Sequence, residues 1–431
     1  MSEADERATI ARRRGGLWHH VDFRKLWIGE TVSQFGTTIS QLALPLTAIL
    51  IVHATTFEVG VLAALESIAF LVVGLPAGAW VDRMRFRWVL ITNDMVRFVA
   101  MASIPVANAC GILTIGQLFV VAVVMSFSTV FFDVAYQSYL PQLVERHELV
   151  EGNAKLQASE SVAQIAGPTL GGILIQALTA PYAVAVDAVS YLCSGLWVWS
   201  IKTRSPKPER RAERNLRREV MEGLRFVVGN RLLRAIAMCT GSSNLFSSMA
   251  FGVIFVLLAR ELHLSAGVIG LVWSISAVGG FIGALSAARI VRGLGQGPTI
   301  WISIAVSLPC AFVAPFLERN WTIALYAAAQ LLWWATVVVY NITQVSFRQG
   351  LCPAHLLGRM NATMRFLVWG TMPIGSLIGG ALGAVVGVRT TLLIAALGGC
   401  IAVVPVFFSP LRHLKELPSS AESVSAEVGV A

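Results

Sequence analysis

The sequence predicts an all-α membrane protein with twelve transmembrane helices, arranged as two homologous six-helix bundles. Three observations predict this fold: the composition, the number of long apolar segments and an internal repeat. Of the 431 residues, 56% are hydrophobic and 13% are charged, and the mean hydropathy is +0.70. A bilayer core about 30 Å thick needs about 20 apolar residues per helix, so twelve helices with short loops account for most of the chain.

Twelve apolar segments are long enough to cross a bilayer. They are 26–52, 58–80, 88–108, 115–139, 156–178, 181–201, 235–258, 267–288, 298–317, 321–345, 361–387 and 391–410. The first segment has full spanning length and follows a mostly polar stretch, residues 1–25. This pattern favours an uncleaved first helix over a removable signal peptide.

Basic residues gather in the loops on one side of these spans. That side holds the basic residues of 202–234 together with Arg12, Arg13, Arg14, Arg83, Arg85, Arg87, Arg289, Arg292, Arg348, Arg359, Arg412 and Lys415. The loops of the other side hold Arg260, Arg319 and Arg389. Cytoplasmic loops carry the excess of Lys and Arg, so both termini are expected in the cytoplasm and the protein in the inner (plasma) membrane. The net charge of +9 is explained in this way and predicts no nucleic-acid partner.

The charge and hydropathy pattern divides the chain into five parts. They are an N-terminal cytoplasmic tail (1–25), an N-terminal six-helix bundle (26–201), a cytoplasmic linker (202–234), a C-terminal six-helix bundle (235–411) and a C-terminal cytoplasmic tail (412–431). In the second part of the linker, apolar residues recur at helical spacing between arginines. This pattern predicts an amphipathic helix on the cytoplasmic membrane face.

The two bundles resemble each other in sequence. A shift of 208 residues places Asp133 on Asn341, Asn153 on Asn361, Gly167 on Gly375, Gly171 on Gly379 and Gly172 on Gly380. Gly-x-x-x-Gly pairs occur in spans two, five, eight and eleven: Gly74 and Gly78, Gly167 and Gly171, Gly279 and Gly283, Gly375 and Gly379. Such pairs lie on one helix face and allow close packing. Duplicated halves are typical of transporters that rock one half against the other.

Three motifs resemble those of the major facilitator superfamily. The loop after span two, Gly78-Ala-Trp-Val-Asp82-Arg83-Met-Arg85-Phe-Arg87, resembles the superfamily's G-x-x-x-D-R-x-x-x-R motif. Gly167-Pro168-Thr-Leu-Gly171-Gly172 in span five resembles the G-P-x-x-G-G motif associated with antiporters. The segment Phe132-Asp133-Val-Ala-Tyr-Gln-Ser-Tyr-Leu-Pro141 is similar to the macrolide-efflux and enterobactin-exporter branch.

The resemblance implies that Gly78, Asp82, Arg83 and Arg87 form a gate that latches the cytoplasmic side. The alternative is that the arginines of this loop set only the topology. One departure from the family matters, because many proton-coupled drug exporters have an arginine in span four. Span four of this chain has no Lys or Arg, so a proton relay built on that arginine is not carried over.

Acidic residues inside the spans are candidates for proton coupling, because buried charges are costly in hydrocarbon. Glu66, well inside span two with no Lys or Arg within a helical turn, is the first candidate; Asp187 and Asp133 follow. The alternative for Glu66 is a structural acid with a hydrogen-bonding role. Asp94 and Arg97 stand three residues apart on one helix face and are expected to neutralise each other.

The resemblance also implies that spans one, four, seven and ten line a central cavity. The residues expected there are Gln34, Thr38, Gln41, Phe131, Asn244, Trp334 and Asn341. Aromatic walls with a few neutral hydrogen-bonding groups suit a large, mostly apolar ligand. The alternative for each of these residues is helix packing.

The sequence therefore predicts a proton-coupled exporter of an amphipathic small molecule, such as a drug, a macrolide-like antibiotic or a siderophore. An importer or lipid translocator on the same fold is the alternative, followed by a membrane sensor without transport. Motifs of hydrolases, zinc proteases and P-loop enzymes are lacking in the sequence, so no enzyme activity and no cofactor are expected. Six scattered cysteines indicate no metal site. The expected partners are the substrate, protons and membrane lipids, and a monomer is expected.

Overall fold

The computed structural model describes residues 16–81, 83–145, 148–202, 216–353 and 356–414, and all elements in this part are helical. The first half comprises α2 (Val21–Leu50), α3 (Thr56–Val72), α4 (Ala77–Val81), α5 (Phe86–Ala109), α6 (Ile115–Leu143), α7 (Leu149–Leu178) and α8 (Ala180–Trp199). The second half comprises α9 (Leu216–Gly229), α10 (Arg231–Val256), α11 (Ala266–Leu294), α12 (Gln296–Ala311), α13 (Thr322–Leu351), α14 (Leu357–Trp369), α15 (Thr371–Val385), α16 (Val388–Gly399) and α17 (Val404–Phe407). Asp82, most of both predicted tails and residues 203–215 of the predicted linker lie outside the described residues.

The predicted membrane spans correspond to these helices. Ten helical segments within the described ranges are long and apolar enough to cross a membrane. The two remaining predicted spans are α2, whose polar side chains lower its hydropathy, and α3 with α4, which a break divides. The all-helical fold with two six-helix bundles is confirmed, because each predicted span coincides with a helix or with helices in direct succession.

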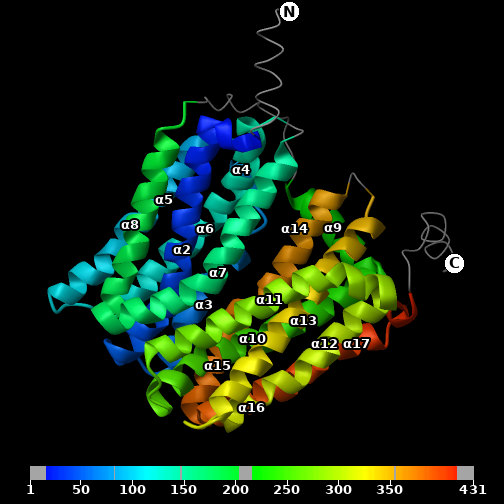
Figure 1. Cartoon of the computed structure of the whole chain (residues 1–431). Helices are drawn as coiled ribbons and strands as arrows, with labels where there is room; N and C mark the ends of the chain where they lie inside the picture. The colour runs from blue at the N-terminus through cyan, green and yellow to red at the C-terminus, as the bar shows by residue number, and fades with distance from the viewer. Residues whose placement is uncertain (1–15, 82, 146–147, 203–215, 354–355, 415–431) are drawn as a thin grey trace, which may run out of the picture.

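The repeat predicted from the sequence is visible in the helix boundaries. Helix α7 begins at Leu149 and α14 begins at Leu357, 208 residues later; α6 ends at Leu143 and α13 at Leu351, which are also 208 apart. Figure 1 shows the first half, coloured blue to green, beside the second half, coloured green to red. The helix predicted in the linker is α9, which packs against α14, where Arg359 pairs with Glu222.

Span two is broken, and this corrects one sequence-based expectation. Helix α3 ends at Val72, before Gly74-Leu75-Pro76, because proline lacks an N–H donor and its ring clashes with the preceding helical turn. Gly74 and Gly78 therefore do not share one face of a continuous helix. A Cβ at Gly78 would meet nothing within 4 Å, so this glycine does not mediate the close packing expected of it.

The largest contacts between the halves are those of α3 with α15 and of α7 with α11, and α3 also packs against α10 and α14. We call the end of the bundles at Val21, Val81, Leu143 and Phe407 the terminal end, and the opposite end, at Leu50, Thr56, Thr179 and Ser265, the far end. The halves touch toward the far end at glycines on facing helices. A Cβ on Gly60 would overlap Gly380, and a Cβ on Gly270 would overlap the backbone of Pro168.

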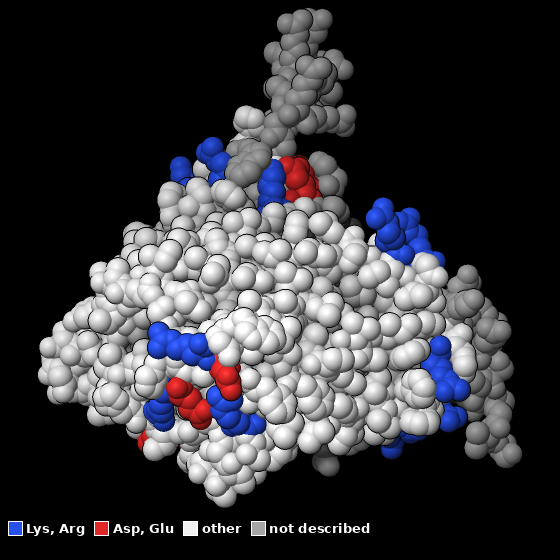
Figure 2. Space-filling view, turned by 60° about the horizontal axis from the view of Figure 1, so that its bottom comes forward, with Lys and Arg blue, Asp and Glu red and all other residues white. Residues whose placement is uncertain are grey.

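Polar contacts reinforce this closure toward the far end. Arg260 Nη2 donates to the carbonyl oxygen of Ala54 across the halves at 2.5 Å, and the Thr169 and Ser274 hydroxyls are 2.7 Å apart. In Figure 2 most of the visible surface carries no Lys, Arg, Asp or Glu, and a small mixed group of basic and acidic residues lies toward the lower left of the view. Because charged side chains are costly in hydrocarbon, a largely uncharged surface suits helices that face lipid.

Candidate functional site

A cavity of about 1140 Å³ lies between the two halves. Its wall contains residues of α3, α4 and α6 from the first half and of α10 to α16 from the second half. Two wall residues toward the terminal end, Gln137 and Gln349, are exposed, whereas glycine contacts close the far end. The cavity is therefore open toward the terminal end, and it is large enough to hold a drug-sized molecule.

Aromatic side chains dominate one part of the wall. They are Phe246, Phe251, Trp273, Tyr326, Trp333, Trp334 and Trp369. The rings of Trp333 and Trp334 meet edge to face at 5.3 Å between centroids, and Trp369 meets Phe70 of α3 at 4.6 Å. Large rings that hold one another in place form a pre-shaped apolar surface, which suits the planar or apolar part of a ligand.

The polar part of the wall contains one acid, Glu66, among the described lining residues. Two cations, Arg348 and Arg365, line the same cavity, and the Arg365 guanidinium lies 5.0 Å from the centre of the Trp369 ring. Gln344 Oε1 and Asn361 Oδ1 are buried at this wall without a hydrogen-bond partner in the described part of the chain. A buried polar atom without a hydrogen-bond partner is costly. A ligand that donates a hydrogen bond to either of these two oxygen atoms would therefore be stabilised.

The structure brings together only some of the residues expected in the cavity. Asn244, Trp334 and Asn341 lie in its wall together with Glu66. Asn244 also donates to the carbonyl oxygen of Val368 at 3.1 Å and so joins α10 to α14. These three residues come from the spans that the family resemblance named, seven and ten.

Span one does not form part of the cavity wall in this structure, and this corrects the expectation for Gln34, Thr38 and Gln41. Helix α2 packs against α7 and α8, so much of its polar side is used within the first half. Gln34 donates to Glu30 at 2.7 Å, and the Thr38 hydroxyl donates to the carbonyl oxygen of Phe35 at 2.9 Å. Gln41 is exposed, outside the lining residues.

Phe131 also lies outside the cavity wall. Its ring stacks on Trp80 at 6.2 Å between centroids, with an angle of 14° between the planes. Both residues belong to the first half, Phe131 to α6 and Trp80 to α4. The ring of Phe131 therefore holds α4 against α6, which is the packing role left open for it.

The gate motif is only partly described. Gly78 lines the cavity, Arg83 is exposed, and Asp82 lies outside the described residues. Arg87 Nη2 donates to the carbonyl oxygen of Trp199 at 2.5 Å, so it satisfies a backbone acceptor at the C-terminal end of α8. Arg87 thus joins the start of α5 to the end of α8 within the first half.

The antiporter-like motif contacts both a helix of its own half and a helix of the other half. A Cβ on Gly167 or Gly171 would press against Thr38 or Ile39 of α2. The carbonyl group of Pro168 and the Cα of Gly172 lie against Gly270 of α11 instead. The motif therefore permits two close helix contacts on different faces of α7, one of which must separate if the far end opens.

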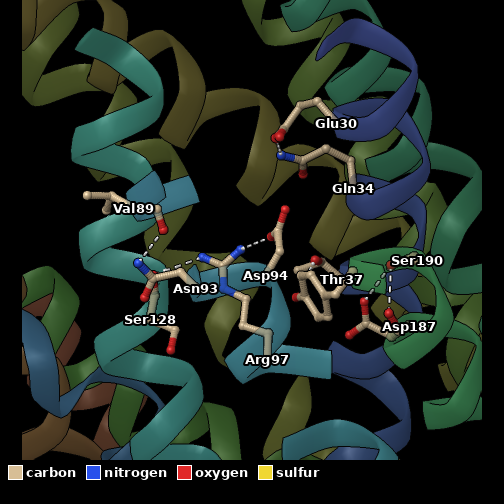
Figure 3. Close-up of polar contacts among 11 residues, drawn as sticks. Glu30, Gln34, Thr37, Val89, Asn93, Asp94, Arg97, Ser128, Asp187 and Ser190 are labelled. Carbon is tan, nitrogen blue, oxygen red and sulfur yellow. Dashed lines mark hydrogen bonds and ion pairs between the residues drawn. The ribbon is translucent and has the colours of Figure 1, made fainter. Parts of the chain in front are cut away.

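Two of the candidate acids lie outside the cavity wall. Asp133 of α6 is under the electrostatic influence of Arg97 and Arg365, and Asp187 of α8 is fully buried within the first half. The pair predicted between Asp94 and Arg97 is present, with 3.7 Å between Oδ1 and Nη1 and both side chains buried (Figure 3). Within the described residues, no group of three or more His, Cys, Asp or Glu could hold a metal ion.

Several wall residues were missed by the sequence analysis, chiefly Trp273, Trp369, Gln344, Arg348 and Asn361. The sequence did contain one signal for Trp369. Tryptophans of membrane proteins are enriched at the two membrane–water interfaces, so a tryptophan well inside a predicted span is unusual. The contributions of α12 and α16 carried no such signal. Their wall residues are mostly small or apolar, like those of any membrane helix.

Comparison with known proteins agrees with this architecture. The family model described as "Major Facilitator Superfamily" matches residues 26–373. The multidrug efflux pump Tap of Mycolicibacterium fortuitum is 26% identical over 378 residues, which cover 84% of this chain and 90% of that protein. The enterobactin exporter EntS of Citrobacter koseri is 22% identical over 407 residues, covering 93% of this chain and 94% of that protein.

Solved structures share the fold. A point mutant of the nucleoside transporter NupG superposes with a TM-score of 0.75 at 12% identity, covering 90% of this chain and 99% of that one. A bacterial homologue of the iron transporter ferroportin in an inward-facing state has a TM-score of 0.72 at 16% identity, covering 90% and 98%. At these identities the likeness concerns the fold alone.

Proposed function

Because this chain belongs to the Major Facilitator Superfamily, a family of transporters, we propose that it is a proton-coupled exporter of an amphipathic small molecule. The substrate class is a drug, a macrolide-like antibiotic or a siderophore. The observation that carries the proposal is the cavity between the halves, whose aromatic wall contains a single acid, Glu66, among its described residues. The names of Tap and EntS, an efflux pump and an exporter, support the same direction.

The proposed cycle alternates access to this cavity. In the present structure the cavity is open toward the terminal end, and the α3–α15 and α7–α11 contacts close the far end. Rocking of the two halves would open these contacts and close the terminal end, where the gate motif lies. The substrate enters beside the aromatic wall, and proton binding to Glu66 accompanies its release on the far side.

Glu66 suits the proton role for a physical reason. It lines a cavity whose described wall has no other carboxyl group, and no ion pair compensates its charge within the described residues. A carboxylate in such a site is costly unless it is protonated or meets a cationic group. Proton binding and release at Glu66 can therefore accompany the opening and closing of the cavity, which couples proton movement to transport. We propose that the transporter works as a monomer surrounded by lipid.

The proposal is tested by expressing the chain in a bacterial host that lacks its main efflux systems. We expect resistance to at least one amphipathic antibiotic, or export of a siderophore, and lower accumulation of that compound. A protonophore should abolish both effects, because it removes the driving force. Higher accumulation would instead indicate uptake, movement of labelled lipid alone would indicate a lipid translocator, and no flux of any compound would leave the sensor alternative.

The proposed orientation places both termini and the 202–234 linker in the cytoplasm. We expect reporter fusions at Lys207 and after Lys415 to be active only with a cytoplasmic reporter, since the basic loops lie on that side. The measurement is a pair of fusions, alkaline phosphatase and a fluorescent protein, at each site. Phosphatase activity at either position would reverse the topology and the direction of the cycle.

A further inference from the structure

The first half contains a buried polar cluster that lies outside the cavity. It contains Glu30, Gln34, Thr37 and Ser40 of α2, Asn93, Asp94 and Arg97 of α5, Ser128 and Asp133 of α6, and Asp187, Ser190 and Tyr191 of α8. Figure 3 labels nine of them: Glu30, Gln34, Thr37, Asn93, Asp94, Arg97, Ser128, Asp187 and Ser190. None of these residues belongs to the cavity wall. The cluster therefore needs an explanation that does not involve direct contact with the substrate.

Charge in this cluster is unbalanced. Arg97 is its single cation, yet four carboxyl groups, those of Glu30, Asp94, Asp133 and Asp187, lie within its electrostatic reach. Arg97 forms an ion pair with Asp94 and donates to the carbonyl oxygen of Ser128 at 3.2 Å. One arginine compensates for about one carboxylate, and in hydrocarbon the other acids must hold protons or find other partners.

Aromatic rings hold the arginine in place. Its guanidinium carbon lies 4.4 Å from the centre of the Phe132 ring and 5.2 Å from that of Tyr191. The Tyr191 hydroxyl is in turn 2.9 Å from the Thr37 hydroxyl, so the ring is fixed between α2 and α8. Arg97 is thus held beside Asp94 and has no ion pair with Asp187 among the described contacts.

Asp187 is one of the acids without an ion pair among the described contacts, and it is the most deeply enclosed of them. It is fully buried, its Oδ1 accepts from the Ser190 hydroxyl at 3.1 Å, and its Oδ2 has no partner in the described part of the chain. Ser40 is buried and faces the Asp187 carboxyl group from α2. Two serine hydroxyls are therefore the polar neighbours of this carboxyl group, and neither carries a charge that could balance a carboxylate. A proton on Oδ2 would remove the uncompensated charge from the hydrocarbon interior.

The other titratable groups around Asp187 form no ion pair with it among the described contacts. Arg97 is the charged residue that acts on it from α5, and Tyr191 lies next to it on α8. Glu160 of α7 acts on Asp133 and Tyr136 instead. On α2, Gly36 leaves room for the acid, because a Cβ there would overlap Asp187 Oδ1 and Ser190 Oγ.

We propose that Asp187 binds a proton in this state and exchanges it during the transport cycle, with Arg97 as the cation shared between Asp187 and Asp94. When the bundle moves and water reaches the cluster, the Oδ2–H bond breaks and the proton passes to water. Arg97 then compensates the carboxylate that remains. The role of this proton exchange in the transport cycle rests on the proposed function, proton-coupled export. Proton binding by Asp187 does not depend on that function.

Infrared spectroscopy of the full-length protein in lipid tests proton binding directly. We expect a carbonyl stretch of a protonated carboxyl that weakens as the pH rises, with one component missing in Asp187→Asn. A different component should be missing in Glu66→Gln. In Ser190→Ala the Asp187 component should remain but move in frequency, because the acid loses its hydrogen-bond donor. This variant also keeps the test decisive if Asp187→Asn fails to fold.

Transport assays test whether the proton on Asp187 takes part in the transport cycle. Asp187→Asn should lose efflux driven by a pH gradient while retaining substrate exchange at equal pH on both sides. The inference is overturned if Asp187→Asn removes no component, if that component does not titrate while the protein remains folded, or if driven efflux persists without it. Absence of pH-driven efflux in the wild-type protein would instead contradict the proposed function, and the infrared titration would still decide proton binding by Asp187.

Discussion

Replacing Glu66 with glutamine is expected to abolish efflux driven by a pH gradient while leaving equilibrium binding of the substrate nearly unchanged. Glutamine resembles the protonated acid in shape and neutrality, but it cannot release a proton. If Glu66 were a structural hydrogen-bonding group, the same substitution would have little effect on either measurement. The decisive comparison is driven efflux against ligand binding in the same purified variant.

A matched control is available for this substitution. Glu318 is an exposed acid in the loop before α13 and is not one of the lining residues of the cavity, so Glu318→Gln should transport like the wild-type protein. Glu66→Asp keeps a titratable group and should retain part of the driven efflux. Loss of both efflux and binding in Glu66→Gln would indicate direct substrate contact or misfolding. Retention of both would transfer the proton role to Asp187 or Asp133.

Replacing Gly270 with alanine is expected to shift the protein away from the state that is closed at the far end. The added Cβ would overlap the carbonyl oxygen of Pro168, so α7 and α11 could no longer approach as closely. Forcing a methyl group into a packed contact costs about 1–3 kcal/mol, which corresponds to roughly a 5- to 150-fold shift in population. Spin labels at the exposed far-end positions Phe57 and Val385 would report the change as longer distances.

The control for this shift lies on the same helix. A Cβ at Gly293 of α11 would meet nothing within 4 Å, so Gly293→Ala tests the loss of glycine without the contact. Gly60→Ala tests a second contact between the halves, against Gly380, and should shift the population in the same direction. Equal distance distributions in Gly270→Ala and Gly293→Ala would contradict the assignment of this contact to the closed state.

The twelve spans, their order and the duplication were predictable from the sequence, because each depends on properties local to a segment. Length and hydropathy define a spanning helix when the bilayer supplies the apolar environment. The repeat between α7 and α14 was visible as a fixed spacing of glycines and polar residues. The Asp94–Arg97 pair was predictable for the same reason, since residues three apart share a helix face.

The composition of the cavity was decided by the tertiary structure. Spans seven and ten contribute Asn244, Trp334 and Asn341 as expected, but span one turns Gln34 and Thr38 into the first half. Which face of a helix meets the cavity depends on its rotation against its neighbours. In lipid this rotation is not set by hydrophobicity, because both the bilayer and the packed interior are apolar.

The sequence by itself determined that this chain crosses a membrane as two duplicated helix bundles, and it placed an acid in span two. The tertiary structure alone decided that Glu66 faces the cavity while Asp187 is buried inside the first half, where Arg97 pairs with Asp94. The physical reason is that a hydrophobic segment is defined by consecutive residues, whereas the partners of a buried charge come from other helices. Those partners, and the close glycine contacts between the halves, exist only once the helices pack.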